Sequence, residues 1–348
     1  MIRKTLDIRH KTKFRLLNYC LLPIVCCVLL SSCFKEKNLL PPTNQGHGQT
    51  AIIEMGPEYP EQFYYSLVSN SVVLHSSRFS YDLMFDAAPD KFNIWLNTAK
   101  SVNVIRTGKT DLDSVLLSDT LTNNRHYELG EFNPDSNAIG KWWIVDSSVP
   151  VSAGQVYLIQ LGVDVAGNPF GYIKMKVNDF SASSYSITYS DFVSASQTVI
   201  IPKDGSRNYS YLTFTSGASV VNNVEPAKTD WDLCFTRYTV FFYAPYNIPY
   251  QVTGVLHNPS RTQAYMDSTM IFDSVQIGSF ENGKLLSRRD AIGYEWKRFS
   301  SLSASGTYSI NYHYTYFIKS DDKFYKLRFF DFEKAGVRGY PTFEYYEL

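Results

Sequence analysis

Short runs of hydrophobic residues that alternate with polar ones follow one another through nearly the whole chain after residue 48. Residues 156–161 and 314–319 are examples, and both runs are rich in Val, Ile, Leu, Tyr, Phe or Thr. A period of two is typical of β-strands with one buried face. Asp204-Gly205 and Asn282-Gly283 lie between such runs and favour hairpin turns. Because no segment keeps a helical period over three turns, the sequence predicts an all-β, mostly antiparallel fold with few short helices.

The hydrophobic pattern also repeats, because five stretches of the first half return in the same order in the second half. The matched pairs are 49–53 with 197–201, 81–85 with 231–235, 113–115 with 267–269 (or 273–275), 138–143 with 291–296, and 174–180 with 326–332. A period near 150 residues is too long for a solenoid unit of roughly 20–50 residues and fits a whole duplicated domain. We therefore expect two tandem, duplicated antiparallel β domains, at residues 49–195 and 196–348.

The N-terminal residues read as a targeting segment. Six basic residues precede an apolar stretch at 16–30, which is too short to span a bilayer, and residues 1–32 therefore form a signal peptide. Leu30, two serines and Cys33 resemble the lipobox of bacterial lipoproteins, which implies cleavage before Cys33 and acylation of that residue. An ordinary signal peptide with an incidental cysteine is the alternative. Residues 33–48 are expected to tether the first domain to the membrane.

Net charge and cysteine content limit which partners and which disulfides are expected. Removing residues 1–32 takes six basic and one acidic residue from totals of 33 each, which leaves 27 against 32 and a net charge of −5. A mildly acidic chain without long basic runs argues against nucleic acid as a partner. Of five cysteines only Cys234 lies after Cys33, so no intrachain disulfide is expected, and Cys234 fits a small buried hydrophobic residue.

No catalytic or phosphate-binding motif stands out in the chain. Asp82 and Asp232 recur at matched positions of the repeat, and we expect them to hold a turn or a strand end in each domain. The sequence therefore predicts a protein that is not an enzyme.

The second half resembles the HmuY-like family of haem-binding lipoproteins from Bacteroidota. The resemblance is carried by residues 228–238 around Trp231-Asp232, by 290–297, by 325–329, and by the ending at 339–345. It covers about residues 196–348, whereas the first half is a diverged copy with Tyr81 in place of the tryptophan. The resemblance implies an all-β fold, an outer-membrane lipid anchor on Cys33, and capture of haem or porphyrin between loops, with iron held by histidine or methionine.

Four residues downstream of the Trp-Asp strand are candidate iron ligands: His257, Met266, Met270 and His313. His257 follows a strand-like run and precedes Asn258-Pro259, so it is expected to reach into a loop. Met266 is expected in a loop, with Tyr265 beside it for stacking on the porphyrin. Met270 fits the core and His313 fits a strand, so the hypothesis is haem bound by His257 and Met266 with Tyr265.

A lipid-anchored, haemophore-like protein of the outer membrane is thus the first functional hypothesis, with an outer-membrane receptor as a further candidate partner. The alternative is a non-catalytic surface module that binds a glycan or a protein partner through its tyrosine-rich loops. Residues 34–37 only faintly resemble the export signals of surface lipoproteins. Exposure at the cell surface and a periplasm-facing anchor both remain open.

Overall fold

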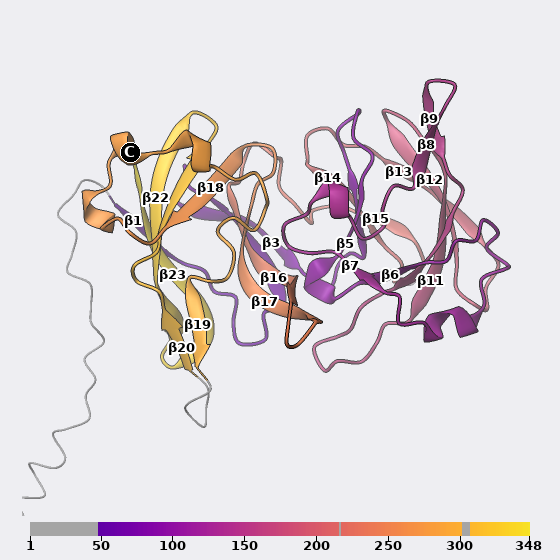
Figure 1. The fold of residues 1–348 in the computed structure, drawn as a ribbon, viewed down its shortest axis with the longest axis horizontal. Helices are drawn as coiled ribbons and strands as arrows, with labels where there is room; N and C mark the ends of the chain where they lie inside the picture. The colour runs from indigo at the N-terminus through magenta and orange to yellow at the C-terminus, as the bar shows by residue number, and fades with distance from the viewer. Residues whose placement is uncertain (1–47, 216, 301–306) are drawn as a thin grey trace, which may run out of the picture. The chain divides into compact units, whose positions relative to one another are not determined.

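The computed structural model describes residues 48–215, 217–300 and 307–348, which form antiparallel sheets joined by loops (Figure 1). The predicted signal peptide, Cys33 and all but the last residue of the predicted tether lie outside the described residues. Helices within the described residues are short 3-10 turns: η1 (Thr98–Lys100), η2 (Leu117–Leu121), η3 (Pro134–Ser136), η4 (Phe272–Ser274), η5 (Ile277–Ser279) and η6 (Asn282–Lys284). The predicted all-β class is confirmed. Among these described helices, none has the length and apolar character needed to cross a membrane.

Two sheets are built mainly from the first half of the sequence. Sheet D runs in the order β13 (Gln197–Pro202), β12 (Ser184–Ser190), β11 (Tyr172–Phe180), β10 (Val156–Gln160), β6 (Asn103–Arg106), β7 (His126–Tyr127). Sheet C runs in the order β15 (Ser219–Val221), β14 (Tyr209–Thr213), β4 (Leu83–Asp86), β5 (Ile94–Leu96). A separate hairpin joins β8 (Trp143–Asp146) to β9 (Val149–Ser152).

The other two sheets are built mainly from the second half. Sheet A runs in the order β1 (Gln49–Ile52), β23 (Val337–Glu347), β22 (Lys323–Lys334), β21 (Thr315–Ser320), β18 (Thr262–Asp267). Sheet B runs in the order β17 (Ile248–His257), β16 (Leu233–Phe242), β2 (Glu61–Ser66), β3 (Ser71–Ser77). A second hairpin pairs β19 (Lys297–Ser300) with β20 (Thr307–Ile310).

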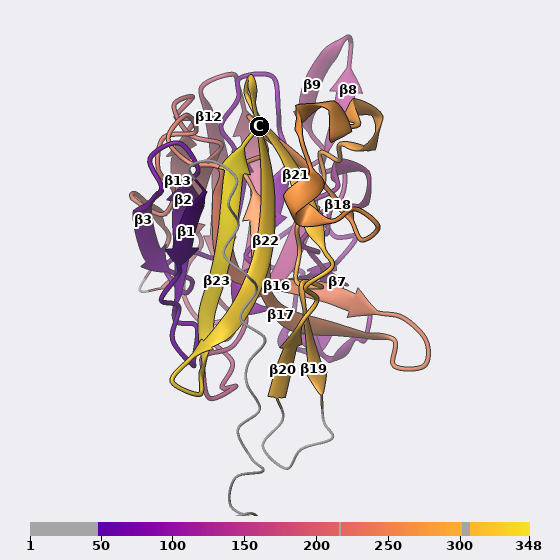
Figure 2. The ribbon, with the colours of Figure 1, turned by 90° about the vertical axis from the view of Figure 1, so that its left-hand side faces the viewer.

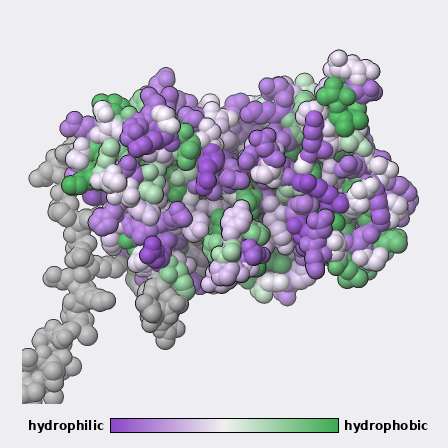
Figure 3. Space-filling view, in the orientation of Figure 1, coloured by the Kyte–Doolittle hydropathy of each residue, from purple (hydrophilic) through white to green (hydrophobic). Residues whose placement is uncertain are grey.

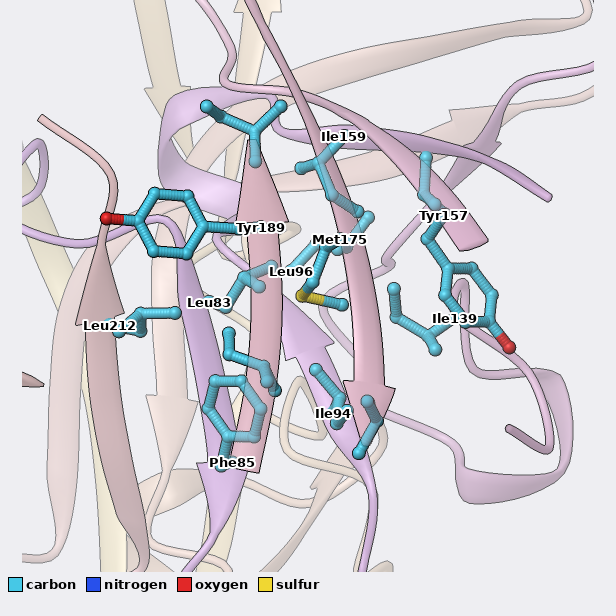
Figure 4. Close-up of a cluster of buried hydrophobic side chains, with 14 of the residues drawn as sticks. Leu83, Phe85, Ile94, Leu96, Ile139, Tyr157, Ile159, Met175, Tyr189 and Leu212 are labelled. Atoms are coloured by element: carbon cyan, nitrogen blue, oxygen red, sulfur yellow. The ribbon is translucent and has the colours of Figure 1, made fainter. Parts of the chain in front are cut away.

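Sheets C and D enclose one hydrophobic core. Leu83 and Phe85 of β4 point into it together with Ile159 and Met175 of sheet D (Figure 4). The intervening residue Met84 points to the opposite face of sheet C, as the strand period of two requires. Each sheet C strand therefore contributes alternate side chains to two different cores.

Sheets A and B enclose a second core, and sheet B also has two buried faces. Leu233 and Phe235 of β16 pack with Phe343 of sheet A, whereas Tyr238 packs with Met84 of sheet C. The four sheets are therefore stacked in the order D, C, B, A, with a hydrophobic core between each neighbouring pair. Because sheets B and C are covered on both faces, β4 and much of β16 are buried at consecutive positions rather than at alternate ones.

The strand pairing crosses the predicted boundary at residues 195 and 196. β1 from the start of the chain pairs with β23 at its end, and β2 pairs with β16. In the opposite direction, β13 pairs with β12 and β14 pairs with β4. Figure 2 shows β1 beside β23. The repeat matches β1 with β13, and each of these two strands pairs with a strand from the other half of the sequence. The opening strands are thus exchanged between the two sheet pairs. The boundary at residues 195 and 196, where the repeated sequence restarts, stays a prediction.

The two matched aspartates hold these exchanged strands. Oδ2 of Asp82 accepts a hydrogen bond from the backbone N–H of Phe214, just after β14, at 2.7 Å. Oδ2 of Asp232 accepts one from the backbone N–H of Leu67, just after β2, also at 2.7 Å. Each aspartate therefore secures the end of a strand that comes from the other half of the sequence, in line with the predicted structural role.

A second matched pair, Asn97 and Asn258, closes the same turns. Nδ2 of Asn97 donates to the carbonyls of residues 78 and 81 at 2.8 Å. Nδ2 of Asn258 donates to the carbonyls of residues 228 and 231, also at 2.8 Å. These two asparagines lie outside the five matched stretches. That the two halves arose from one duplicated domain stays a prediction, which these shared contacts support.

The tryptophans follow the repeat with a shift of one residue. Its Gly-to-Trp spacing matches Trp143 with Trp296, but the core tryptophan of the first half is Trp142, which is 2% exposed. The ring of Trp142 packs edge-on against Phe180, and that of Trp296 packs edge-on against Phe332. Trp143 lies half-buried at the start of β8 instead.

Candidate functional site

A cavity of about 650 Å³ lies in the family-like second half, between the β16–β17 hairpin and the β19–β20 hairpin. Its volume falls in the range of small-molecule sites. Seven of its lining side chains are aromatic: Tyr59, Phe242, Tyr250, Tyr294, Phe299, Tyr308 and Tyr314. Four are basic and two are acidic: Arg237, Lys297, Arg298 and Arg338, with Glu58 and Glu295. We call this space the aromatic-cationic cavity.

The exchanged N-terminal segment supplies one wall of this cavity. Tyr59 follows β1 and adopts a positive φ of 49°, and its carbonyl accepts a hydrogen bond from Nε of Arg78 at 2.8 Å. Burial raises the pKa of Tyr59 to about 12, so the phenol stays protonated at neutral pH. The cavity of the second half is therefore completed by residues that precede β2.

Gly339, in the family-like ending, brings this segment close. Gly339 lies beside Gly56 of the N-terminal segment, and the Gly56 N–H donates to the Gly339 carbonyl at 3.1 Å. A Cβ at Gly339 would lie 2.1 Å from the Gly56 carbonyl oxygen, and its φ of +102° also disfavours a side chain. The glycine of the Gly339-Tyr340-Pro341 motif is thus explained by backbone packing beside the cavity.

Two of the basic residues, the half-buried Arg237 and the buried Lys297, lie next to Thr253 of β17. Arg237 lies opposite Thr253 in the β16–β17 ladder, and the Thr253 carbonyl accepts a hydrogen bond from Nζ of Lys297. Lys297 is 7% exposed, and its Nζ lies 4.3 Å from the centroid of the Trp296 ring. Arg237 is thus paired with Thr253 in the ladder, and Lys297 binds the carbonyl of the same residue.

Burial dominates the electrostatics of this pair. It lowers the pKa of Lys297 to about 7 and lowers the pKa of Arg237 below its ordinary value. Nε of Arg237 is buried without a hydrogen-bond partner. Within the described residues, no acidic side chain lies within 4.0 Å of Arg237 or Lys297, although Glu58 and Glu295 line the same cavity.

A second cavity of about 370 Å³ adjoins the first, because Tyr294, Glu295 and Tyr314 line both. Met266 lines this second space and is 37% exposed. Met266 lies within β18, where it pairs with Tyr316, rather than in the predicted loop. Its thioether is nevertheless accessible from a cavity, which is the property that an iron ligand needs.

His257 and Tyr265 do not line either cavity. His257 is the last residue of β17 and is fully buried, with its ring nitrogens 2.8 Å from the Arg288 carbonyl and 3.2 Å from the Asn258 carbonyl. Burial lowers its pKa to about 4, so the imidazole is neutral. In this conformation neither nitrogen is open to iron. The structure therefore does not bring His257 into the space that Met266 reaches.

Tyr265 is buried as well. Its ring stacks on Phe317 with centroids 4.6 Å apart, and its hydroxyl accepts a hydrogen bond from the Glu281 backbone at 3.0 Å. Met270 packs against the same cluster, as expected for a core residue. His313 lies in the turn between β20 and β21 and is exposed, because the strand starts only at Thr315 rather than at the histidine.

Other parts of the described chain do not offer the same combination of aromatic and basic groups. A cavity of about 680 Å³ beside Tyr325 and Tyr345 has Lys326 as its basic group, but the ammonium of Lys326 already donates to the carbonyls of Phe272 and Val275. In the described part of the chain, no three His, Cys, Asp or Glu side chains gather as a metal site. The β8–β9 hairpin exposes an apolar tip (Figure 3) formed by Ile144, Val145 and Val149.

Sequence reasoning missed the basic residues of the aromatic-cationic cavity. Arg237 follows the same alternation as Leu233 and Phe235, so the pattern could have placed it on the core-facing side of β16. Lys297 directly follows the matched Trp296 and carries no comparable signal. Its burial depends on how the β19–β20 hairpin packs against β17.

Comparison with known proteins links the second half to one family. Residues 205–345 match the family model described as HmuY protein. A solved structure of a protein named as an HmuY-like heme binding protein, from Bacteroides vulgatus ATCC 8482, matches with 17% sequence identity. That match covers 40% of this chain and 86% of the other, with a TM-score of 0.19. No curated protein matches the chain.

Proposed function

Residues 205–345 belong to the HmuY family, and from this premise we propose that the chain is a lipid-anchored, haemophore-like protein of the cell envelope. The observation that carries the proposal is the aromatic-cationic cavity, which lies in the family-matched part. Aromatic walls suit a flat porphyrin, and basic groups suit its carboxylates. Reversible binding needs no catalytic residue, so we propose no enzymatic role.

Met266 is the residue that we propose as an iron ligand. A thioether is an established haem ligand, and Met266 lines the cavity that adjoins the aromatic-cationic one. The pairing of Met266 with His257, and stacking on Tyr265, stay predictions. For His257 to bind iron, its ring must leave the carbonyls of Arg288 and Asn258. Tyrosine can also bind haem iron, and Tyr294 and Tyr314 line both cavities.

Titration of haemin into the purified mature protein tests this function. We expect a protein-bound Soret band that differs from that of free haemin at micromolar concentrations. If the spectrum stays that of free haemin, the proposal is refuted. Met266→Ala should shift the bound spectrum, whereas Met270→Ala, in a core cluster, should leave it unchanged and serves as the matched control.

Anchoring and location complete the proposal. The lipobox-like sequence supports acylation of Cys33 and attachment to the outer membrane, with an outer-membrane receptor as a candidate partner. Metabolic labelling with a radioactive fatty acid should mark the native chain and not Cys33→Ser. Protease treatment of intact cells should remove the protein if it faces outward, and protection would assign it to the periplasmic face.

One observation favours the second candidate, a module that binds an acidic glycan. Among the described residues that line the aromatic-cationic cavity there is no histidine, cysteine or methionine, so that space by itself offers no common nitrogen or sulfur ligand for iron. Aromatic and guanidinium groups also hold sugar acids. Binding of uronate-containing oligosaccharides without any haemin binding would establish this alternative.

A further inference from the structure

Arg237 and Lys297 are two basic residues that line the aromatic-cationic cavity, and among the described residues neither has a carboxylate within 4.0 Å. Lys297 is 7% exposed, and Nε of Arg237 is buried with no hydrogen-bond partner. Burying a cation costs free energy unless an anion or several hydrogen bonds offset the lost hydration. The buried Lys100 meets this condition, since its Nζ lies 2.5 Å from the carboxylate of Asp82. Arg237 and Lys297 have no carboxylate this close, although Glu58 lines the same cavity and, against the effect of burial, raises the pKa of Arg237.

The geometry of the pair fits one carboxylate. Arg237 faces Thr253 across the β16–β17 ladder, and the ammonium of Lys297 is hydrogen-bonded to the Thr253 carbonyl. Both side chains line the same cavity, Arg237 from β16 and Lys297 from β19. A guanidinium binds a carboxylate through two parallel hydrogen bonds, and an ammonium adds a third donor.

The rest of the wall is aromatic. Tyr59, Tyr250 and Tyr308 line the cavity together with Arg237. Flat apolar surfaces beside two basic groups select a ligand that combines an aromatic ring system with a carboxylate.

We infer that Arg237 and Lys297 form a carboxylate-binding subsite, and that the carboxylates of a tetrapyrrole, rather than its metal, provide most of its affinity. The inference rests on the proposed function. It predicts that metal-free protoporphyrin IX binds within about tenfold of haemin. Protoporphyrin IX dimethyl ester, which has the same rings but no carboxylate, should bind at least tenfold more weakly than the acid.

The test measures quenching of tryptophan fluorescence in the mature protein by haemin, protoporphyrin IX and the dimethyl ester. Arg237→Gln should weaken binding of protoporphyrin IX at least tenfold and leave binding of the ester unchanged. A merely structural effect would weaken both ligands equally. Arg207→Gln, which removes an arginine paired with Asp204 at the surface, is the matched control and should change neither.

Lys297→Met gives an independent readout. The substitution removes a buried cation but keeps an apolar chain against Trp296, so we expect a higher melting temperature together with weaker binding of the acid. A lower melting temperature, or unchanged binding of the acid, would count against the subsite. Equal affinity of the native protein for acid and ester would overturn the inference outright.

The two proposals fail in different ways. If haemin binds but the ester matches the acid, haem binding stands and the carboxylate subsite is wrong. If no tetrapyrrole binds, the proposed function is wrong, and 2-naphthoate then tests the subsite alone. Binding of 2-naphthoate but not of 2-naphthamide, lost in Arg237→Gln, would retain the subsite, and absence of 2-naphthoate binding would refute it.

Discussion

Removal of the buried charge at Asp82 should destabilise the protein strongly. In the native protein the Asp82 carboxylate lies 2.5 Å from Nζ of Lys100, and the two side chains are 0% and 2% exposed. The same carboxylate accepts hydrogen bonds from the Phe214 backbone at 2.7 Å and from the Thr213 hydroxyl at 3.2 Å. Asp82→Asn therefore leaves the Lys100 ammonium buried without an acidic partner.

The size of the effect follows from these contacts. Breaking a buried ion pair by removing one partner costs about 3–5 kcal/mol. The asparagine oxygen can still accept from Phe214, so we add no further cost for that N–H. A loss of about 4 kcal/mol is a large part of the roughly 5–15 kcal/mol that stabilises a typical domain. Lys100→Met should cost a similar amount, because it leaves the carboxylate without its cation.

Equilibrium unfolding in urea measures these changes. The double variant Asp82→Asn/Lys100→Met has no buried charge at this site, so its loss should fall clearly below the sum of the single losses, with a coupling energy of about 2–4 kcal/mol. Lys109→Met is the control, since Lys109 forms a 2.6 Å pair with Asp119 while being 34% exposed. Its cost should be at most about 1 kcal/mol. If Asp82→Asn and Lys100→Met each cost less than about 1 kcal/mol, and the double variant costs their sum, the reasoning is refuted.

Three further predictions concern the exchanged strands and two buried titratable groups. Residues 196–348 alone lack β1–β3 and should show no cooperative thermal unfolding, whereas residues 48–348 should unfold in one transition. Burial lowers the pKa of His257 from 6.5 to about 4, so the unfolded chain binds the extra proton and stability should fall by up to about 3 kcal/mol as pH drops through that window. His257→Gln should remove this dependence in urea titrations at pH 7 and pH 4.5. Burial raises the pKa of Glu128 from 4.5 to about 8, so its contribution to stability is lost as pH rises through that range. The free energy of unfolding of Glu128→Gln, compared with that of the native protein, should therefore be higher at pH 8.5 than at pH 5.

The strands could be predicted from sequence, but their partners could not. Alternation and aromatic content indicated the all-β fold, and the matched Asp82 and Asp232 correctly indicated a structural role. Residues 49–53 and 197–201 are nearly identical, so the local pattern fits the edge of either sheet equally well. Which edge each strand joins is decided by contacts far along the chain, such as that of Asp232 with Leu67.

The candidate site could also be predicted only in part from the sequence. A loop position for His257 was inferred from the Asn258-Pro259 turn, yet its ring turns inward, where its two nitrogens lie beside the carbonyls of Arg288 and Asn258. The alternation along β16 could have placed Arg237 on the core-facing side, but Lys usually indicates solvent, so Lys297 could not be placed at a buried wall from spacing. Their burial arises where two hairpins and the N-terminal segment meet, which no local window of sequence contains.

The exchange of opening strands also fixes an order of events in folding. A polypeptide that emerges N-terminus first presents β1 and the β2–β3 hairpin long before β23 and β16, the partners of β1 and β2, have been made. Strands β4 to β14 can close their own two sheets in the meantime, because all of their partners lie between residues 83 and 221. The leading strands must wait with unpaired edges until the last residues arrive. Completion of the Tyr59 wall is therefore among the latest steps, and the ligand cavity forms only when the whole chain is present.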